Sequence, residues 1–387
     1  MMPLRKTAVL LGAGHAHLYA IRRAEEFRRR GVRLVLIAPG PFWYSGLATG
    51  MLGGFYPPAQ DQIDAAGLVR AGGGDFIQGK AARIDAAGQQ VVLGDSREIS
   101  YDALSINVGS EAVEIPGAET AANVYPLKPL ECLASLRRDL EAAGATASRV
   151  VVVGGGASGG EIALNLRALL NRTGGKQLTV TLLSAGDQFF EQFAPPVARK
   201  AVRLLRDRGV EMHLGAKVVR VTDGVAQTES GERIAFDFLV NAAGLRPSTL
   251  PGASGLATDA GGALRVNRFL QVVGQPAIFG GGDCVAFEER PLDKVGVYAV
   301  RAAPVLFHNL LVTCGRERPK ALRPFKPQRH YLSILNVGDG TGLAIWRGLS
   351  WHGRAAFWLK DWLDRRFLAA SGQTPAIHGG QSGSARD

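Results

Sequence analysis

The sequence predicts an α/β protein with two Rossmann-like units and a small C-terminal region made of a β-hairpin and a helix. Two apolar runs, Thr7–Leu11 and Arg149–Val153, each end in a glycine-rich turn that opens a helical pattern. A third run, Ala277–Phe287, contains another glycine turn, which Asp283 closes. Short apolar runs bounded by glycine are typical of buried parallel strands. With 387 residues, the chain is long enough for two or three domains.

The first unit continues from its glycine turn into a helical pattern over His17–Arg30 and a second apolar run, Val32–Ala38. Its turn has the letters of a nucleotide-binding loop, but His17 stands where the third glycine is expected. We expect the His17 ring to pack between helix and sheet. We expect His15, near the amino end of the helix, to donate to a phosphate.

The second unit matches the pattern G-x-G-x-x-G at Gly154, Gly156 and Gly159. These glycines serve the tight turn, the close approach of the backbone to a pyrophosphate, and the packing of helix on strand. The amino end of the helix, which includes Ser158, offers unpaired N–H groups to the phosphates. The pattern therefore predicts a dinucleotide site.

Neither unit has an acidic residue at the end of its second strand, where it would bind a ribose 2′-hydroxyl. The first unit has Ala38 there and the second has Ser184. Ser184 can accept either nucleotide, so the sequence does not choose between NADH and NADPH.

The C-terminal region starts after a basic connector, Gly315–Arg329. A hairpin pattern follows, with its turn near Gly338–Gly340, and then an amphipathic helix over Gly353–Ala370. The aromatic and basic residues of this helix fit either a membrane interface or packing on the first unit. We favour packing, because Asp361 and Asp364 dilute the positive face. The residues from Ser371 are expected to be disordered.

The composition limits the class of protein. The excess of 45 basic over 34 acidic residues gives a net charge of +11, but the basic residues are scattered outside the connector, so no nucleic-acid partner is expected. The three cysteines are far apart, which indicates neither a disulfide framework nor a metal site and fits a reducing cytoplasm. We expect no signal peptide and no 18-residue apolar span.

The order of these motifs resembles that of the two-dinucleotide-binding-domain flavoproteins, the pyridine nucleotide-disulfide oxidoreductase superfamily. "YDALSINVGS", Tyr101–Ser110, resembles the crossover strand beside FAD, and Asp283 resembles the aspartate that binds the flavin ribityl chain. The resemblance implies FAD on the first unit and NAD(P)H on the second. The implied FAD contacts are Gly12, Ala13, Gly14, His15, Ala16, Ala81, Asn107, Gly109, Gly282, Asp283, Val295 and Gly296. The implied NAD(P) contacts are Gly154, Gly156, Ser158, Gly159, Ser184, Ala243 and Gly244.

The same resemblance sets the expected domain boundaries. Residues 1–112 and 264–325 would form a discontinuous FAD-binding domain, and residues 113–263 the NAD(P)-binding domain. Residues 326–370 would form the hairpin and helix, and residues 371–387 a disordered tail.

Within the superfamily the chain is most similar to the type II NADH dehydrogenase and sulfide:quinone oxidoreductase branch. It resembles more closely still the flavin domain fused to some selenophosphate synthetases, where "GHAH", "YSG" and a Lys-x-Gly-Val stretch occur together, here Gly14–His17, Tyr44–Gly46 and Lys294–Val297. The stretch that holds the redox disulfide in disulfide reductases, Tyr44–Leu52, has no cysteine. The glutamines that type II enzymes carry near the quinone are replaced by Val297, Arg301 and Ala302.

We therefore expect an FAD-dependent oxidoreductase that passes a hydride from NAD(P)H to FAD and on to an acceptor such as a quinone. Lys294, or the N–H groups of Val295 and Gly296, would stabilise negative charge on the reduced flavin. Glu161 either lies near the nicotinamide or is simply favoured by the helix dipole. Alternatives are a slow NAD(P)H sensor or scaffold, and a flavoenzyme that oxidises a sulfur or selenium compound. The expected location is the cytoplasm, with peripheral contact to the inner face of the membrane left open.

Overall fold

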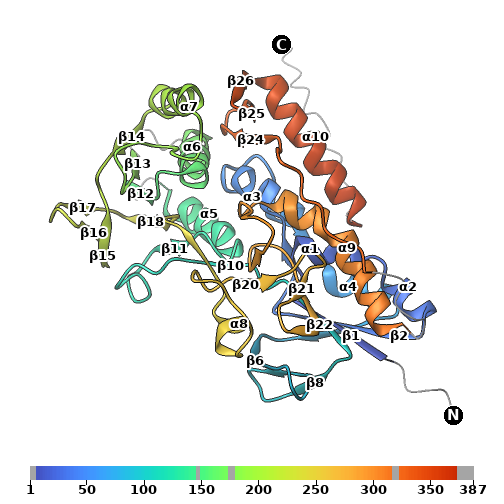
Figure 1. Ribbon diagram of the computed structural model, residues 1–387. Coiled ribbons are helices and arrows are strands. Elements are labelled where there is room, and N and C mark those ends of the chain that lie inside the picture. Colours follow the sequence, from blue (N-terminus) through green and yellow to red (C-terminus); the bar gives the residue numbers. More distant parts are fainter. Residues whose placement is uncertain (1–5, 145–148, 173–178, 316–321, 373–387) are drawn as a thin grey trace.

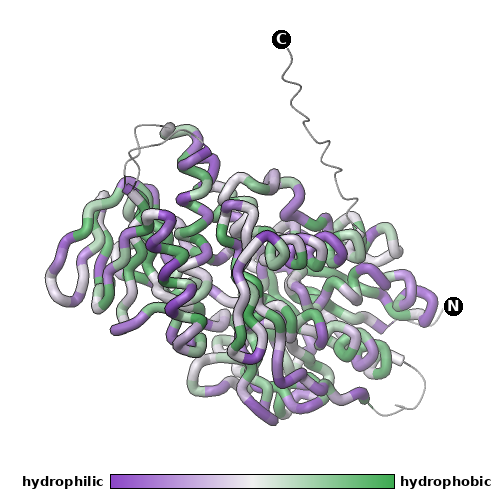
Figure 2. Tube along the Cα trace, turned by 90° about the horizontal axis from the view of Figure 1, so that it is seen from above, coloured by the Kyte–Doolittle hydropathy of each residue, from purple (hydrophilic) through white to green (hydrophobic). Residues whose placement is uncertain are grey.

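The computed structural model describes residues 6–144, 149–172, 179–315 and 322–372. The chain forms two lobes, each built on a parallel sheet with flanking helices, and the C-terminal segment contacts both lobes (Figure 1). Hydrophobic segments gather inside the lobes and hydrophilic segments lie mainly toward the outside (Figure 2). The architecture is the mixed α/β fold that the sequence predicts.

The larger sheet combines strands from two distant parts of the sequence. At its centre β1 pairs in parallel with β2 on one side and with β9 on the other, and β9 pairs with β22. The sheet order is β23 (Val285–Phe287), β20 (Leu264–Val266), β21 (Gln271–Val272), β22 (Gln275–Gly280), β9 (Ala103–Ile106), β1 (Lys6–Leu11), β2 (Val32–Ala38) and β5 (Asp75–Gln78). The central strands are continuous apolar runs because both of their faces are buried.

The helical pattern predicted over His17–Arg30 forms two short helices. α1 (His15–Ile21) and α2 (Ala24–Arg29) are separated by a turn at Arg22 and Arg23. The break lets α1 pack on α9 (Gly296–Cys314) while α2 packs on β2. A further helix, α4 (Ala65–Ala71), packs on β5.

By length and composition, α9 could cross a membrane, contrary to the expectation that no 18-residue stretch would qualify. It is the one such helix among the described residues. In this fold α9 packs against α1, β1, β9 and β22, and 56% of its most apolar window is buried. Its apolar composition is therefore explained by its place in the core of the first lobe.

The second lobe is built on a five-stranded parallel sheet from a continuous part of the chain. Its order is β11 (Val124–Pro126), β18 (Phe238–Asn241), β12 (Arg149–Val153), β13 (Thr179–Leu183) and β14 (Val210–His213). The helices of this lobe are α5 (Glu131–Ala143), α6 (Ala157–Arg172) and α7 (Pro195–Asp207), and an antiparallel sheet of β15 (Val218–Thr222), β16 (Val225–Thr228) and β17 (Arg233–Ala235) extends from it.

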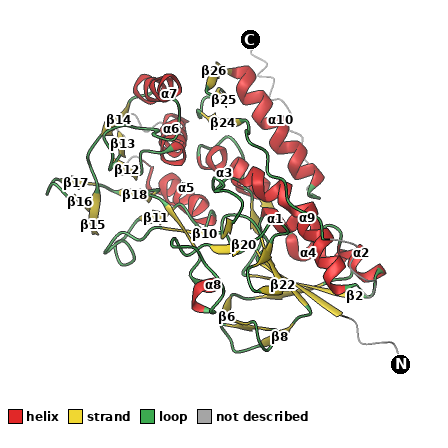
Figure 3. Ribbon diagram, viewed as in Figure 1, coloured by secondary structure: helices red, strands yellow, loops and turns green. Residues whose placement is uncertain are grey.

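Short elements join and cover the lobes (Figure 3). β10 (Ser110–Ala112) pairs with β19 (Leu245–Pro247) between the lobes, and α3 (Ser45–Leu52) packs on both α5 and α6. The remaining elements are β3 (Phe42–Trp43), η1 (Pro58–Asp61), β4 (Gln62–Ile63), β6 (Ala81–Asp85), β7 (Gln90–Leu93), β8 (Glu98–Ser100) and α8 (Leu250–Ala253).

The C-terminal region is an antiparallel sheet of three strands followed by one helix. β24 (Ser333–Asn336) and β25 (Gly342–Trp346) form the predicted hairpin, and β26 (Leu349–Gly353) is a third strand that the sequence analysis missed. α10 (Arg354–Ala370) follows directly. The disordered tail was expected from Ser371, but Ser371 and Gly372 form a turn; residues 373–387, like part of the basic connector, lie outside the described residues.

Candidate functional site

The first glycine turn is closed by Asn107, which follows β9. Gly12 has a φ of +92°, and a Cβ there would overlap the carbonyl oxygen of Asn107. A Cβ on Gly14 would lie 2.7 Å from Asn107 Nδ2, and one on Gly282 would overlap Asn107 Oδ1. Asn107 Nδ2 is buried and has no hydrogen-bond partner among the described residues. Such a group calls for a partner, and the lack of a side chain at the three glycines lets Asn107 pack against both turns.

The neighbouring cofactor positions predicted from the sequence lie around this turn. The Ser110 hydroxyl donates to Asp283 Oδ2 at 3.2 Å, which brings the crossover strand to the Gly-Asp turn. Gly109, just before Ser110, has a φ of +75°, and Ala16 lies against Gly281. Ala13 is also buried, whereas Ala81 starts β6 near the end of β5.

His17 packs between α1 and the sheet, as predicted. Its Nδ1–H donates to Gly12 O at 2.6 Å, and its Nε2 accepts from the Ser105 hydroxyl at 2.8 Å. The side chain is fully buried, and burial lowers its pKa to about 4, so the ring is neutral. In this position the imidazole holds the glycine turn against the sheet, through Gly12 O and the Ser105 hydroxyl.

His15 lies where three distant motifs meet. Its ring contacts Phe42, Tyr44 and Phe367, with ring centroids 4.8, 5.5 and 5.9 Å apart. A Cβ on Gly296 would lie 3.5 Å from His15 Nε2, so the "GHAH", "YSG" and Lys-x-Gly-Val stretches converge at this point. Burial, followed by the charge of Lys128, lowers the His15 pKa to about 3. The ring is therefore neutral and would bind a phosphate only through a neutral N–H.

Lys128 is a cation of the site that the sequence analysis missed. It follows β11 on the segment that enters the second lobe, and its charge acts on both His15 and Asp283. Burial lowers the pKa of its ammonium, and Asp283 partly offsets that effect. No motif in the sequence marks it, because only the fold brings it to the first glycine turn.

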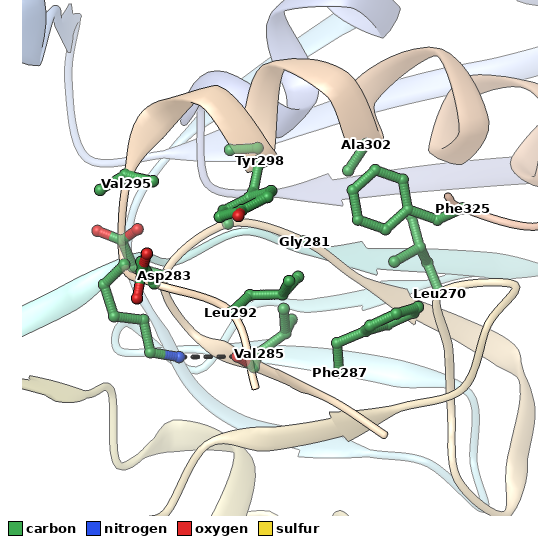
Figure 4. Close-up of a pocket in the computed structure, with 14 residues that line it drawn as sticks. Leu270, Gly281, Asp283, Val285, Phe287, Leu292, Val295, Tyr298, Ala302 and Phe325 are labelled. Carbon is green, nitrogen blue, oxygen red and sulfur yellow. Dashed lines mark hydrogen bonds between the residues drawn. The ribbon is translucent and has the colours of Figure 1, made fainter. Parts of the chain in front are cut away.

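Lys294 lies at the rim of an apolar pocket beside the Gly-Asp turn (Figure 4). Its Nζ is exposed and donates to Val285 O at 2.8 Å, as the dashed line in Figure 4 shows. The Val295 N–H donates to Asp293 O at 2.9 Å. The pocket is lined mainly by Leu270, Phe287, Leu292, Tyr298, Ala302 and Phe325. In this arrangement the Val295 N–H is used within the chain, and so is one of the three N–H donors of the Lys294 ammonium.

The second glycine turn repeats the construction of the first. Gly154 has a φ of +130°, and a Cβ there would overlap Ala242 O, just after β18. A Cβ on Gly159 would overlap Gly154 O, so α6 can approach the strand only with glycine at this position. Gly156 differs, because the nearest atom to its Cβ would be Gln192 Nε2 at 3.7 Å. Gly156 and the exposed Ser158 therefore face open space, where the pattern predicts the dinucleotide phosphates.

A segment after β13 covers this turn. Phe190 has a φ of +58°, donates its N–H to Gly155 O at 2.9 Å, and packs its ring where a Cβ on Gly160 would lie. A bulky residue with positive φ is uncommon and marks a constrained place in the chain. The sequence analysis did not single out this segment, since its only signal is that it follows the second strand.

The other NAD(P) positions lie at the carboxyl ends of β13 and β18. Ser184 is buried against Gly155, and its hydroxyl donates to Gln188 O at 3.4 Å. Ala243 N donates to Asn241 Oδ1 at 3.2 Å, and Gly244 O accepts from Val113 N at 3.0 Å. These contacts fix the edge of the sheet on which the glycine turn stands.

Glu161 joins the second lobe to two other parts of the chain. Its Oε1 accepts from the Thr49 hydroxyl of α3 at 2.9 Å and from Asn336 N of β24 at 2.8 Å. Burial raises the pKa of its carboxyl, and Lys360 is the main opposing charge. The structure thus gives Glu161 contacts that neither interpretation of the sequence included.

The helix α3 occupies the place where disulfide reductases carry their cysteines, and it has none. All three cysteines of the chain are free. Cys284, next to Asp283, is fully buried, and burial raises the pKa of its thiol to about 11. It is a buried, inert thiol.

The two turns, the Gly-Asp turn and the crossover strand define a flavin- and nicotinamide-dependent oxidoreductase. Residues 6–303 match the family model described as pyridine nucleotide-disulphide oxidoreductase, and the chain belongs to this family. The family uses FAD and NAD(P)H, and the chain is an oxidoreductase of that kind.

Three relatives each cover between 59% and 70% of the chain. The ferroptosis suppressor protein 1 of Taeniopygia guttata is 28% identical over 289 residues, 70% of this chain and 71% of that protein. An NADH dehydrogenase-like protein of Mycobacterium tuberculosis is 32% identical over 243 residues, 59% of this chain and 58% of that protein. The putidaredoxin reductase of Pseudomonas putida is 32% identical over 271 residues, 66% of this chain and 61% of that protein.

Solved structures share the fold over almost the whole length. NDH2 from Plasmodium falciparum, in complex with NADH, superposes with a TM-score of 0.79 at 14% identity, covering 95% of this chain and 97% of its own. The sulfide:quinone oxidoreductase of Aquifex aeolicus has a TM-score of 0.77 at 18% identity and covers 95% and 91%.

Proposed function

We propose that this protein passes a hydride from NAD(P)H to FAD and then reduces a quinone, without a redox-active disulfide. The observation that carries the proposal is the position of α10. Its Phe367 stacks on Tyr44 with ring centroids 4.7 Å apart and contacts His15 at the first glycine turn. The outer face of the same helix exposes tryptophans. One element thus connects the predicted redox centre with a surface suited to lipid.

The residues present fit FAD. The unpartnered Asn107 Nδ2, which lies at the turns that hold Gly12, Gly14 and Gly282, suits a polar ligand, and Asp283 with Lys128 places one charge of each sign beside it. FAD would supply hydride acceptance and its transfer onward. The protein's part is to hold the ligand, with His17 and Ser105 bracing the turn.

The segment that stands in place of the redox cysteines supports a quinone as the electron acceptor. Where a thiol pair would relay electrons, Tyr44 and α3 are instead covered by α10, and the Tyr44 hydroxyl donates to Asp364 Oδ1 at 2.8 Å. The likeness to the type II NADH dehydrogenase branch and the convergence of the three motifs at His15 also support the proposal. Lys294 is proposed to stabilise negative charge on the reduced flavin. Glu161 is proposed to hold α6 against α3 and β24.

We further propose peripheral contact with the cytoplasmic face of an anionic membrane. Trp358 and Trp362 are 61% and 54% exposed on α10, one turn apart, with Arg354 and Arg366 over their rings. Leu349, on the neighbouring strand, is 73% exposed. Tryptophan beside arginine is typical of helices that lie in a membrane interface. Lys200 of α7 donates to Ser350 O of β26, so α7, with its exposed Arg199, Arg203 and Arg206, lies beside the C-terminal sheet.

Anaerobic titration with NADH and NADPH, followed by a short-chain quinone, tests the proposed reaction. We expect the flavin absorbance to bleach with at least one nucleotide and to return when the quinone is added. A flavin that neither nucleotide reduces would contradict the proposal and would turn attention to sulfur or selenium compounds that reduce FAD directly. Rapid bleaching without reoxidation by quinone would favour the sensor alternative.

Replacing both Trp358 and Trp362 by serine is expected to weaken binding to vesicles containing anionic lipid by at least about tenfold, because apolar area drives interfacial binding. Vesicle co-sedimentation measures the effect. Val113→Ser, at a 41% exposed apolar residue between the lobes, is the matched control and should bind like the unchanged protein. Equal binding by all three proteins would refute the membrane contact.

A further inference from the structure

Asp61, at the end of η1, is a buried carboxyl with no partner. Its side chain is fully buried, and neither Oδ1 nor Oδ2 has a hydrogen-bond partner within the described parts of the chain. Its backbone carbonyl accepts from Tyr44 N at 2.8 Å, which fixes the residue beside the amino end of α3. An ionised carboxylate in such a place would be costly, so the group needs either a cation or a proton.

The cation that acts on Asp61 is Lys360 of α10, but its ammonium already binds other groups. Its Nζ donates to Asp364 Oδ2 at 2.7 Å and to Gly46 O, and it also offsets the charge of Glu161. Lys360 acts on Asp61 as well, whereas Asp364 opposes ionisation there. One ammonium thus faces three carboxyls, so the cluster would carry two net negative charges if all three were ionised, and a held proton reduces that charge.

The titratable groups around Asp61 come from four elements. The Tyr44 hydroxyl donates to Asp364 Oδ1, and the Tyr44 ring contacts the His15 ring at the first glycine turn. The full set is His15 of α1, Tyr44 and Tyr56 at the two ends of α3, Glu161 of α6, and Lys360, Asp361, Asp364 and Arg365 of α10.

We propose that Asp61 holds the proton that this cluster delivers, through Lys360, to the acceptor of the redox reaction. The proposal rests on the proposed quinone reductase function. Conversion of a quinone to a hydroquinone takes two electrons and two protons. A hydride carries both electrons and one proton, so one oxygen of the acceptor still needs a proton. We attribute this proton to the pair of Asp61 and Lys360, and a proton from solvent replaces it after each turnover.

Burial raises the Asp61 pKa to about 8, which agrees with this role because the carboxyl is then neutral at the pH of the cell. A group whose folded pKa lies above its unfolded value of 3.8 costs stability as pH rises between the two values. Asp61→Asn keeps the shape of the neutral acid. Its melting temperature should therefore rise relative to the unchanged protein from pH 5 to pH 8.

The test combines this stability measurement with two half-reactions of the holoenzyme. In Asp61→Asn, reduction by NAD(P)H should be unchanged, and reoxidation by a short-chain quinone should slow by about 10- to 100-fold and lose its dependence on pH near 8. Reoxidation by ferricyanide, which takes electrons without protons, should be unaffected. Asp61→Glu should restore part of the quinone rate. Asp139→Asn, a carboxyl outside this cluster that binds Tyr125 and Arg138, is the control.

Two outcomes would overturn the proposal. One is an unchanged pH profile of quinone reoxidation in Asp61→Asn. The other is an infrared difference spectrum between Asp61→Asn and the unchanged protein that contains no band of a protonated carboxyl. If no quinone reoxidises the protein at all, the proposed function fails, but the infrared and stability measurements still decide whether Asp61 carries a proton.

Discussion

Alanine in place of Gly12 is expected to abolish flavin binding and to lower the free energy of unfolding by about 3 kcal/mol, from the cost of positive φ and of overpacking. Gly12 has a φ of +92°, and its new methyl group would overlap the carbonyl oxygen of Asn107. Both strands that meet at the turn, β1 and β9, would have to separate. The flavin absorbance of the purified protein and its urea denaturation curve measure the two effects.

Gly40→Ala is the matched control, because nothing lies within 4 Å of a Cβ at that position. It should retain the flavin and change stability by less than about 0.5 kcal/mol. A Gly12→Ala protein that purifies with bound flavin and an unchanged denaturation midpoint would show that the first glycine turn is not built as described.

Methionine in place of Lys360 is expected to destabilise the protein by about 3–5 kcal/mol, the usual cost of removing one partner of a buried ion pair. Lys360 and Asp364 are only 14% and 11% exposed. The pKa of the lysine is raised despite burial, because Asp364 and then Glu161 lie close. Its stabilisation is therefore complete below its unfolded pKa of 10.5 and is lost only as the pH rises through the folded pKa.

The destabilisation by Lys360→Met should be smaller at pH 5 than at pH 8. At the lower pH the carboxyls that have lost their cation can take up protons, which removes part of their unpaired buried charge. Arg366→Met removes the same charge from an exposed position on the same helix and should cost less than about 0.5 kcal/mol. Denaturation curves of both variants at the two pH values make the comparison. Equal losses of unfolding free energy in the two variants would contradict the buried position of Lys360 in the charged cluster.

The strands, the two glycine turns and the role of His17 could be predicted because their signals are local. Gly12 and Gly154 each follow a buried apolar run, and a turn of this kind needs glycine whatever surrounds it. The same local pattern did not show the break between α1 and α2, which depends on how those helices pack on α9 and β2.

The charged cluster could not be predicted, because its members come from segments far apart in the sequence. Asp361 and Asp364 were interpreted as acids that dilute a positive surface, and the packing of α10 was favoured on that ground. Packing occurs, but these two acids belong to the buried face, where they bind Tyr56 and Tyr44 at 2.7 and 2.8 Å. Sequence spacing shows that residues share a face of a helix, and it does not show which face is covered.

The larger sheet has a consequence for biosynthesis. Its strand β9 pairs on one side with β22, where Leu104 lies beside Ile278, and the whole sheet of the second lobe is encoded between them. As the chain leaves the ribosome, the second lobe is complete while the first still lacks the strands β20 to β23 and α9. Domains generally fold as units during synthesis. The nicotinamide lobe is therefore expected to fold first, and the flavin can be captured only after residues near Asp283 have emerged.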